Sequence, residues 1–239
     1  MYSETLTLKA AAAVAHIDAN ELRHTAQRGE IDATLRGGEW YFRRRDVDEW
    51  MQRHLLSARK RDLTECHRSM ADERRRRGIA KDGRLVENLL RIECIDLSLC
   101  AKAKAGVVRD MTDLAEKSGL VYDSDALFRE VLAREEAAST AIGEGAAFLH
   151  PRYHDPYMFE DSFIAYARGE KPVFFGAPDG AGTRHFFLIC AADRDLHLHV
   201  LARLAVLAHG AGLIERLEEA ATPEDVLSAI RAAEAEYPS

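Results

Sequence analysis

A charged stretch near the middle of the chain, residues 56–84, most constrains what this sequence can fold into. It contains few apolar positions, and it includes Arg59-Lys60-Arg61 and the run of four arginines at 74–77. Such a stretch can form a solvated helix or a flexible tether, but it cannot supply a hydrophobic core. The 239 residues are therefore expected to divide into a small front unit, residues 1–55, and a larger back unit, residues 85–239.

The two parts of the chain differ in charge. Residues 1–80 carry 16 Lys/Arg and 13 Asp/Glu, a net charge of +3, whereas residues 81–239 carry 17 and 27, a net charge of −10. A slightly basic front and an acidic back indicate that the two parts meet different partners.

Cysteine spacing and hydropathy exclude several classes of protein. The four cysteines form no CxxC pair, which argues against a zinc site or a disulfide framework. No apolar run approaches the ~18 residues that a membrane span needs, and no signal peptide is visible. We therefore expect a cytoplasmic protein that has no membrane partner and needs no metal or organic cofactor. The cysteines are Cys66, Cys94, Cys100 and Cys190.

The front unit is predicted to be a short helical domain with a β-hairpin. Thr7 and Asp18 are good N-caps for two helices, and Gly29 suits the end of the second. Alternating residues around Gly37-Gly38 predict a hairpin. The expected elements are helices 8–15 and 19–28, strands 31–35 and 40–42, and a helix over 45–55.

Two motifs give this unit a family resemblance. The first is Leu6-Thr7-Leu8-Lys9-Ala10-Ala11-Ala12, and the second runs from Gly37-Gly38-Glu39-Trp40 to Glu49-Trp50. Together they resemble the excisionase-type, MerR-like winged helix-turn-helix DNA-binding domain. The resemblance implies that the helix over 19–28 enters the major groove of DNA while the wing neutralises phosphates. The implied contacts are Arg23, His24 and Arg28 on the helix, and Arg36, Arg43 and Arg44 on the wing.

Charge leaves a second interpretation of the front unit open. Residues 1–50 sum to −2, and Asp18 and Glu21 on the expected recognition helix repel phosphate. A DNA-binding face usually concentrates positive charge. The alternative is that the front unit keeps this fold but acts as an adaptor that binds protein, or binds DNA only weakly as a dimer.

The back unit alternates helical and extended patterns, which predicts an α/β layered domain. Gly119 is expected to end one helix and Ser124 to cap the next, while Thr222-Pro223 is a strong helix start. The expected strands are 143–149, 163–166, 173–175 and 185–190, with a turn at 178–180 and a helix over 199–207.

The stretch from Arg134 to His150 carries the second resemblance. Arg134-Glu135, Ser139-Thr140, Ile142 and His150 are spaced as in the EIIA domain of the phosphoenolpyruvate–sugar phosphotransferase system, in its fructose, mannitol and nitrogen-regulatory branch. The segment around His197-Leu198-His199 is similar to a second motif of that family. The resemblance implies a three-layer α/β domain with a mixed sheet, and a histidine that an HPr-like carrier phosphorylates.

The resemblance also implies a role for each motif residue. His150 matches the phosphorylated histidine, and His197 matches a second histidine that donates a hydrogen bond to a phosphoryl oxygen. Arg134 matches an arginine whose planar fork suits phosphate, and Ser139 and Thr140 lie in a loop of hydroxyl or backbone donors. The residues alone leave one alternative: Asp195, His197 and His199 could hold a metal ion.

We therefore interpret the chain as a regulatory phosphohistidine phosphocarrier of the EIIA type. In this hypothesis an HPr-like carrier phosphorylates His150, and the front unit binds DNA to regulate transcription. A phosphorylation-dependent regulator that binds another protein, with no specific DNA binding, is the main alternative. Leu149 stands where the family usually has Pro, so an EIIA-like domain that no longer accepts phosphate is a third. A homodimer remains open.

Overall fold

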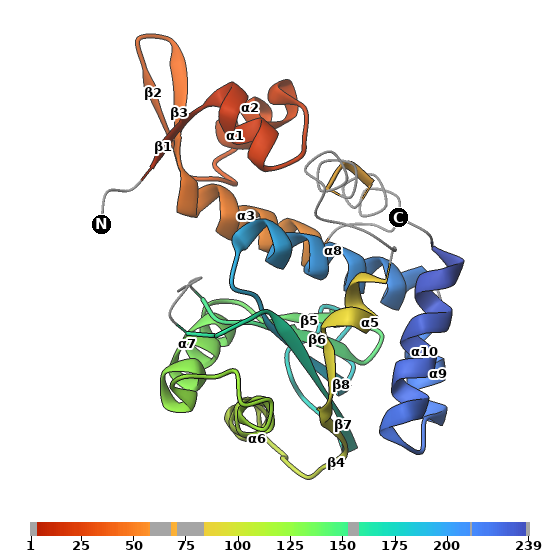
Figure 1. The fold of residues 1–239 in the computed structure, drawn as a ribbon. Coiled ribbons are helices and arrows are strands. Elements are labelled where there is room, and N and C mark those ends of the chain that lie inside the picture. Colours follow the sequence, from red (N-terminus) through yellow and green to blue (C-terminus); the bar gives the residue numbers. More distant parts are fainter. Residues whose placement is uncertain (1–3, 58–67, 71–83, 153–157, 211, 238–239) are drawn as a thin grey trace.

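The computed structural model describes residues 4–57, 68–70, 84–152, 158–210 and 212–237. A small winged helix-turn-helix unit lies against a larger α/β unit (Figure 1). Both basic runs of the charged stretch lie outside the described residues. The front unit consists of β1 (Thr5–Thr7), α1 (Leu8–Val14), α2 (Ala19–Gln27), β2 (Ala33–Arg36), β3 (Glu39–Arg43) and α3 (Arg44–Ser57).

The predicted helix caps and hairpin turn of the front unit are present in the structure. The Thr7 hydroxyl accepts from the Ala10 amide at 3.4 Å, and Asp18 accepts from Asn20 at 2.8 Å, so both act as N-caps. Gly37 and Gly38 have φ of +58° and +84°, the two positive values that a type I′ hairpin turn requires. The sequence did not predict β1, which joins the hairpin in a sheet of order β1-β3-β2.

The turn between α1 and α2 has an unusual residue. His16 has a φ of +51°, in the left-handed region that a non-glycine residue adopts only at a cost. Its Nδ1 lies 3.2 Å from the Ser69 hydroxyl, in the short described piece of the charged stretch. The side chain therefore gains a partner at the position where the backbone is strained.

The back unit is built on a mixed five-stranded sheet of order β4-β7-β8-β6-β5. β4 runs parallel to β7, β6 runs parallel to β8, and the other two pairs are antiparallel. The strands are β4 (Leu90–Leu99), β5 (Ala141–Gly143), β6 (Ala146–Leu149), β7 (Phe163–Val173) and β8 (Thr183–Cys190). The helices are α5 (Leu85–Leu89), α6 (Lys104–Glu116), α7 (Ser124–Ala137), α8 (Arg194–Gly210), α9 (Leu213–Glu219) and α10 (Pro223–Glu236).

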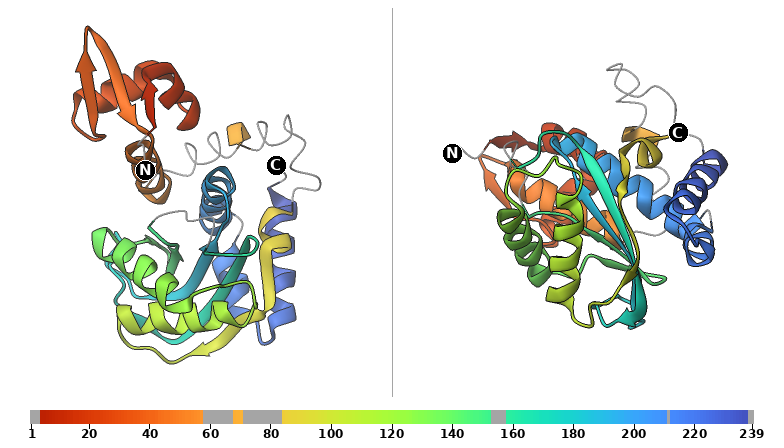
Figure 2. Two further views of the ribbon diagram at one scale, coloured as in Figure 1. Left: turned by 60° about the vertical axis from the view of Figure 1, so that its left-hand side comes forward. Right: turned by 60° about the horizontal axis from the view of Figure 1, so that its bottom comes forward.

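Helices cover both faces of this sheet, which gives three layers (Figure 2). Helices α6 and α7 pack on one face around one apolar cluster, and α8 and α10 pack on the other around a second. The second cluster continues into the front unit, because α3 lies along α8. The predicted α/β class, with a mixed sheet and a winged front unit, is confirmed.

Several boundaries differ from the prediction. Asp123, not Ser124, caps α7, because its carboxylate accepts from the Ala126 amide at 2.8 Å. The expected strand over 143–149 is a hairpin of β5 and β6, since Glu144 and Gly145 turn with positive φ. The expected strand over 173–175 is the end of β7, which extends to Val173. β4, α5 and α9 were not predicted.

Within the described residues no single helix is long and apolar enough to cross a membrane. Only α8 and α9 taken together, bent by 79° at their break, reach that length and composition.

A buried histidine ties the sheet to α9. The Tyr166 hydroxyl donates to Nδ1 of His185 at 2.8 Å, and Nε2 of His185 donates to Glu218 at 3.1 Å. Burial lowers the pKa of His185 below its ordinary value, against the opposing effect of Glu218. The neutral ring is therefore the form that the folded chain prefers.

This shift predicts a dependence of stability on pH. The unfolded chain binds a proton at this position more readily, so the contribution of His185 is present above the ordinary histidine pKa near 6.5 and is lost as the pH falls below it. The loss should be at most ~1.4 kcal/mol per pH unit. Urea denaturation of wild type and His185→Gln between pH 7.5 and 5.5 tests this. The variant should show the shallower decline, and parallel curves would contradict the assignment.

Candidate functional site

The ring of His150 lies fully buried at the end of β6. Its Nδ1 is 2.8 Å from the carbonyl oxygen of Phe148, which can only accept a hydrogen bond. Nδ1 therefore carries a proton and donates it to this oxygen. In the neutral ring this leaves Nε2 with a lone pair, so the fold defines Nε2 as the basic and nucleophilic atom of His150.

Arg134, in the last turn of α7, holds this nitrogen. Its Nε donates to Nε2 of His150 at 3.0 Å, and its Nη1 donates to the Ala138 carbonyl at 2.8 Å. Nη2 is buried and has no hydrogen-bond partner among the described residues. Burial lowers the pKa of Arg134 and neighbouring Glu135 raises it, with burial the larger effect. One guanidinium donor thus remains available next to the histidine.

His197 brings a second imidazole to the same place. It lies in the first turns of α8, fully buried, with its ring centroid 4.8 Å from that of His150 and the planes tilted by 57°. The structure thus unites His150, Arg134 and His197 from β6, α7 and α8. No three His, Cys, Asp or Glu side chains in the described part of the chain could hold a metal ion, so the alternative of a metal at Asp195, His197 and His199 gains no support.

Ser139 and Thr140 are placed differently. The Ser139 hydroxyl donates to the Phe175 carbonyl at 2.7 Å, and the Thr140 hydroxyl donates to Glu135 at 2.6 Å. The Thr140 carbonyl accepts from the Phe148 amide at 3.1 Å, on the strand that leads to His150. The described contacts of the two hydroxyls are therefore with the loop and with Glu135, not with His150.

Glu135 is a residue whose importance the sequence analysis missed. Its buried carboxylate accepts from both the amide and the hydroxyl of Thr140, at 2.9 and 2.6 Å, and from Lys104 at 2.8 Å. It adjoins Arg134 in the motif, and that position was the available signal. The carboxylate fastens the loop of Ser139 and Thr140 to α7 and to the start of α6.

The front unit also supplies a side chain to the site. Gln52 of α3 is buried, with its amide oxygen 3.1 Å from Nε2 of His150 and 3.4 Å from Nε of Arg134. Nothing in the sequence signalled this contact, because Gln52 and His150 are 98 positions apart and belong to different units.

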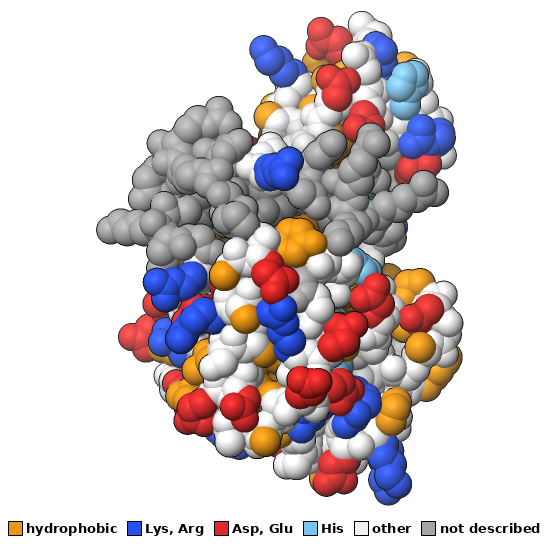
Figure 3. Space-filling view, turned by 90° about the vertical axis from the view of Figure 1, so that its right-hand side faces the viewer, with side chains coloured by type: hydrophobic (Ala, Val, Ile, Leu, Met, Phe, Trp, Pro, Cys, Tyr) orange, Lys and Arg blue, Asp and Glu red, His pale blue; other side chains and the backbone are white. Residues whose placement is uncertain are grey.

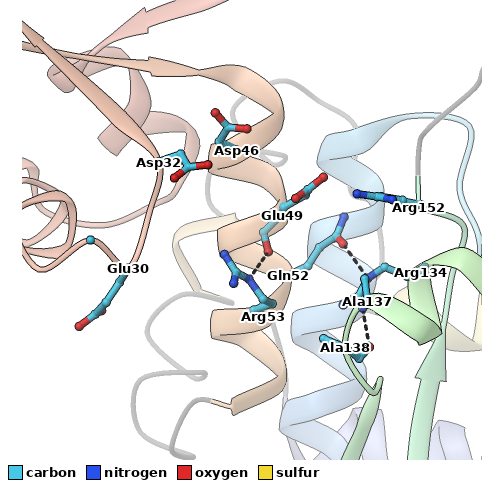
Figure 4. A pocket seen from close by; sticks show the side chains of 11 residues that line it. Glu30, Asp32, Asp46, Glu49, Gln52, Arg53, Arg134, Ala137, Ala138 and Arg152 are labelled. Atoms are coloured by element: carbon cyan, nitrogen blue, oxygen red, sulfur yellow. Dashed lines mark hydrogen bonds between the residues drawn. The ribbon is translucent and has the colours of Figure 1, made fainter.

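A cavity of about 330 Å³ adjoins these residues at the junction of the two units. Glu49 and Gln52 of α3 line it together with Arg134 and Arg152 of the back unit, and Gln52 is hydrogen-bonded to Arg134 (Figure 4). The front unit contributes all four carboxylates and one arginine, and the back unit contributes two arginines. The lining residues are Gly29, Glu30, Asp32, Asp46, Glu49, Gln52, Arg53, Arg134, Ala137, Ala138 and Arg152.

The candidate DNA contacts on the wing divide into two groups. Arg36 and Arg43 are exposed, and Arg43 pairs with Asp46 at 2.5 Å and more distantly with Asp32. Arg44 instead pairs with Asp48 one turn further along α3, at 3.4 Å, and reaches Asp195 of the back unit at 3.5 Å. The structure therefore places Arg44 between the units and not on the wing surface.

The candidate contacts on α2 engage local partners. Arg23 donates to Asn20 at 2.9 Å, His24 lies 3.2 Å from Gln27, and Arg28 forms an ion pair with Glu30. On the face of the molecule in Figure 3, acidic and basic side chains are interspersed over both lobes.

Comparison with known proteins assigns both parts of the chain. Residues 88–233 match the family described as "Phosphoenolpyruvate-dependent sugar phosphotransferase system, EIIA 2". The chain belongs to this EIIA family. Residues 5–55 match the family described as "Helix-turn-helix domain".

Relatives align with the EIIA domain. The fructose-specific EIIA component of Haloferax volcanii is 29% identical over 150 residues, covering 61% of this chain and 96% of that protein. The fructose-specific EIIABC component of Bacillus subtilis is 29% identical over 147 residues, but this chain spans only 23% of its length. The crystal structure of the nitrogen regulatory protein IIA-Ntr from Neisseria meningitidis is similar with a TM-score of 0.55 and 26% identity, covering 61% of this chain and 99% of that one.

The Glu135 network predicts a loss of stability in the EIIA domain. Glu135→Ala would leave the amide and hydroxyl of fully buried Thr140 without an acceptor. We expect the free energy of unfolding to fall by about 3 kcal/mol, as for other buried groups that lose a charged partner. Urea denaturation measures the change. Glu136→Ala, at an exposed position one residue on, is the matched control and should stay within ~0.5 kcal/mol of wild type. Equal losses in the two variants would contradict this role for Glu135.

Proposed function

We propose that this chain is a regulatory phosphocarrier of the EIIA type, in which an HPr-like phosphocarrier protein phosphorylates Nε2 of His150 and the helix-turn-helix domain binds DNA. The observation that carries the proposal is the hydrogen bond from Nδ1 of His150 to the Phe148 carbonyl at 2.8 Å. It leaves the lone pair of the neutral ring on Nε2, next to the guanidinium of Arg134.

The proposed step exchanges one phosphorus–nitrogen bond for another. Nε2 of His150 attacks the phosphorus of a phosphohistidine on the carrier, the new bond to Nε2 forms, and the bond to the carrier's imidazole breaks. The carrier histidine leaves with the electron pair as a neutral imidazole, so no other reactant is required. Nδ1 of His150 keeps its proton throughout, because the Phe148 carbonyl holds it.

Arg134 and His197 are placed to stabilise the negative charge that develops on the transferring phosphoryl group. Negative charge spreads over the three equatorial oxygens of the transferring group, so fixed cationic donors lower the barrier. Nη2 of Arg134 has no partner among the described residues and can turn to one oxygen. His197 lies beside His150 and can donate a hydrogen bond to another phosphoryl oxygen. Ser139 and Thr140 act in this proposal by holding the loop in place.

The packing of Leu149 supports phosphate acceptance over a degenerate domain. Leu149 is fully buried and lies opposite Leu188 in the β6–β8 pair. A leucine can donate its backbone N–H to a strand pairing, whereas a proline cannot. The replacement of the usual proline therefore leaves the strand that positions His150 intact.

Phosphotransfer tests the role of His150. With phosphoenolpyruvate, enzyme I and an HPr-type carrier, the wild-type chain should gain one acid-labile phosphate by intact mass, and His150→Ala should gain none. Arg134→Lys should slow the transfer about 100-fold, because lysine lacks the planar fork.

A second histidine variant is the control for this measurement. His209→Ala alters a partly exposed histidine whose described contact is with Glu144, and it should accept phosphate at the wild-type rate. Phosphate that persists in His150→Ala, or no uptake by wild type, would contradict the proposal.

DNA binding would depend on the exposed wing arginines and on α2. With a duplex selected from a random pool, Arg36→Ala and Arg43→Ala should each reduce affinity several-fold. Each should also reduce the slope of log K against log salt by about 1, the signature of a lost phosphate contact. Arg23 and His24 are the proposed base contacts, and Arg28 joins them if its pairing with Glu30 opens.

An arginine of the EIIA domain provides the matched control. Arg231→Ala removes a basic side chain that pairs with Glu87 on the far side of the sheet from α7, and the salt slope should not change. Failure to select any duplex would favour the protein-binding adaptor instead.

A further inference from the structure

Helix α3 of the helix-turn-helix domain occupies the reactive side of His150. In phosphoryl transfer the phosphorus must come within about 3–3.5 Å of the attacking nitrogen. An amide atom of Gln52 lies 3.1 Å from Nε2. This atom fills the space next to Nε2. A phosphoryl group and the Gln52 amide therefore cannot be there together, and attack also requires Nε of Arg134, 3.0 Å from Nε2, to release the lone pair.

Ion pairs and apolar packing hold α3 in this place. Asp48 of α3, which is buried, lies 2.9 Å from Nε of Arg194 at the start of α8, and Arg44 lies 3.5 Å from Asp195. The apolar cluster runs without interruption from the helix-turn-helix domain into α8. The contact of Gln52 with His150 is thus part of an extended interface between α3 and α8.

The charge of the junction opposes a phosphorylated histidine. Glu30, Asp32, Asp46 and Glu49 of the helix-turn-helix domain line the cavity that Arg134 and Arg152 line from the other side (Figure 4). Arg53 of α3 also lines the cavity, so the helix-turn-helix domain contributes four carboxylates against one arginine. Without phosphate, Arg134 and Arg152 face this net negative wall. A phosphoryl group on His150 would bring nearly two negative charges to the same place and repel the carboxylates.

We propose that docking of the helix-turn-helix domain and phosphorylation of His150 exclude one another. Helix α3 covers the surface on which the phosphocarrier protein must dock, so the carrier and the domain compete for it. Once formed, the phosphohistidine keeps the domain released. This inference rests on the proposed function and names the regulation of the same site.

The proposal makes the rate of phosphorylation depend on how often α3 leaves. Only the open fraction of the chain can react, so the apparent rate at limiting carrier falls in proportion to that fraction. A substitution that weakens the interface between α3 and the EIIA domain should raise the rate of phosphorylation, even when the substituted residue is not His150, Arg134 or His197. If the interface only stabilised the fold, weakening it would not raise the rate of phosphorylation.

Two variants of the full chain open the interface by different means. Gln52→Ala removes the amide beside Nε2, and Asp48→Ala removes the partner of Arg194 and Arg44. Initial rates of acid-labile phosphate uptake from the HPr-type carrier should rise at least threefold in each and about tenfold in the double variant. Arg45→Ala, an exposed residue of the same helix paired only with Asp46 among the described contacts, is the control and should match wild type.

A second readout needs no phosphocarrier. Diethyl pyrocarbonate modifies accessible imidazole nitrogens, and peptide mass spectrometry measures modification at His150. Wild type and Arg45→Ala should be protected, and the two opening variants should react at least threefold faster at this histidine. Circular dichroism of each variant checks that a faster reaction does not come from unfolding.

The outcomes separate the two proposals. Phosphate on His150 at equal rates in wild type and in folded opening variants would overturn the exclusion and leave the proposed function intact. So would equal modification by diethyl pyrocarbonate. No phosphate on any variant, with His150 reactive to the reagent in the open ones, would instead end the proposed function and this inference with it.

Discussion

Helix α8 must be covered on all sides, and much of the architecture follows from that constraint. Every residue from Leu196 to Ala208 is buried, including the polar His197, His199 and Arg203, so no face of this stretch is left to solvent. The sheet covers one side, and α3 of the helix-turn-helix domain lies along another. The same helix begins with Arg194 and Asp195, which pair with α3, and then carries His197 into the site. The packing that covers α8 therefore brings the helix-turn-helix domain to His150.

Two hydrogen-bonding groups, the Phe148 carbonyl and the Arg134 guanidinium, determine the state of His150. The Phe148 carbonyl accepts from Nδ1 of His150 and so leaves the lone pair of the neutral ring on Nε2. Arg134 donates from one nitrogen, Nε, toward both His150 and Gln52. Because the Arg134 guanidinium contacts both His150 and Gln52, it links the histidine of the EIIA domain to the position of helix α3.

The sequence predicted what local chemistry decides. Thr7, Asp18 and Thr222 cap helices as expected, because an N-cap depends on residues within one turn. β4 was missed because register shifts against β7 break the alternation of buried residues that marks a strand.

The site was predictable only in part. Arg134 and His150 follow a recognisable spacing and do meet. The role of Gln52 was missed because it depends on packing between elements that no spacing in the sequence reveals. The role of Glu135 was missed although it stands next to Arg134 in the motif. Arg44, which the wing pattern assigned to DNA phosphates, pairs instead with acidic residues at the junction of the two units.

Because Gln52 and His150 belong to one polypeptide, the cover is an intramolecular ligand. Its effective concentration at the histidine is set by the connecting chain, on the order of mM for short tethers, and not by how much protein the cell contains. Under the proposed function, a free carrier at lower concentration would have to displace a ligand that never diffuses away. The threshold for response would then be fixed by the interface between α3 and α8, and it would stay the same however strongly the regulator is expressed.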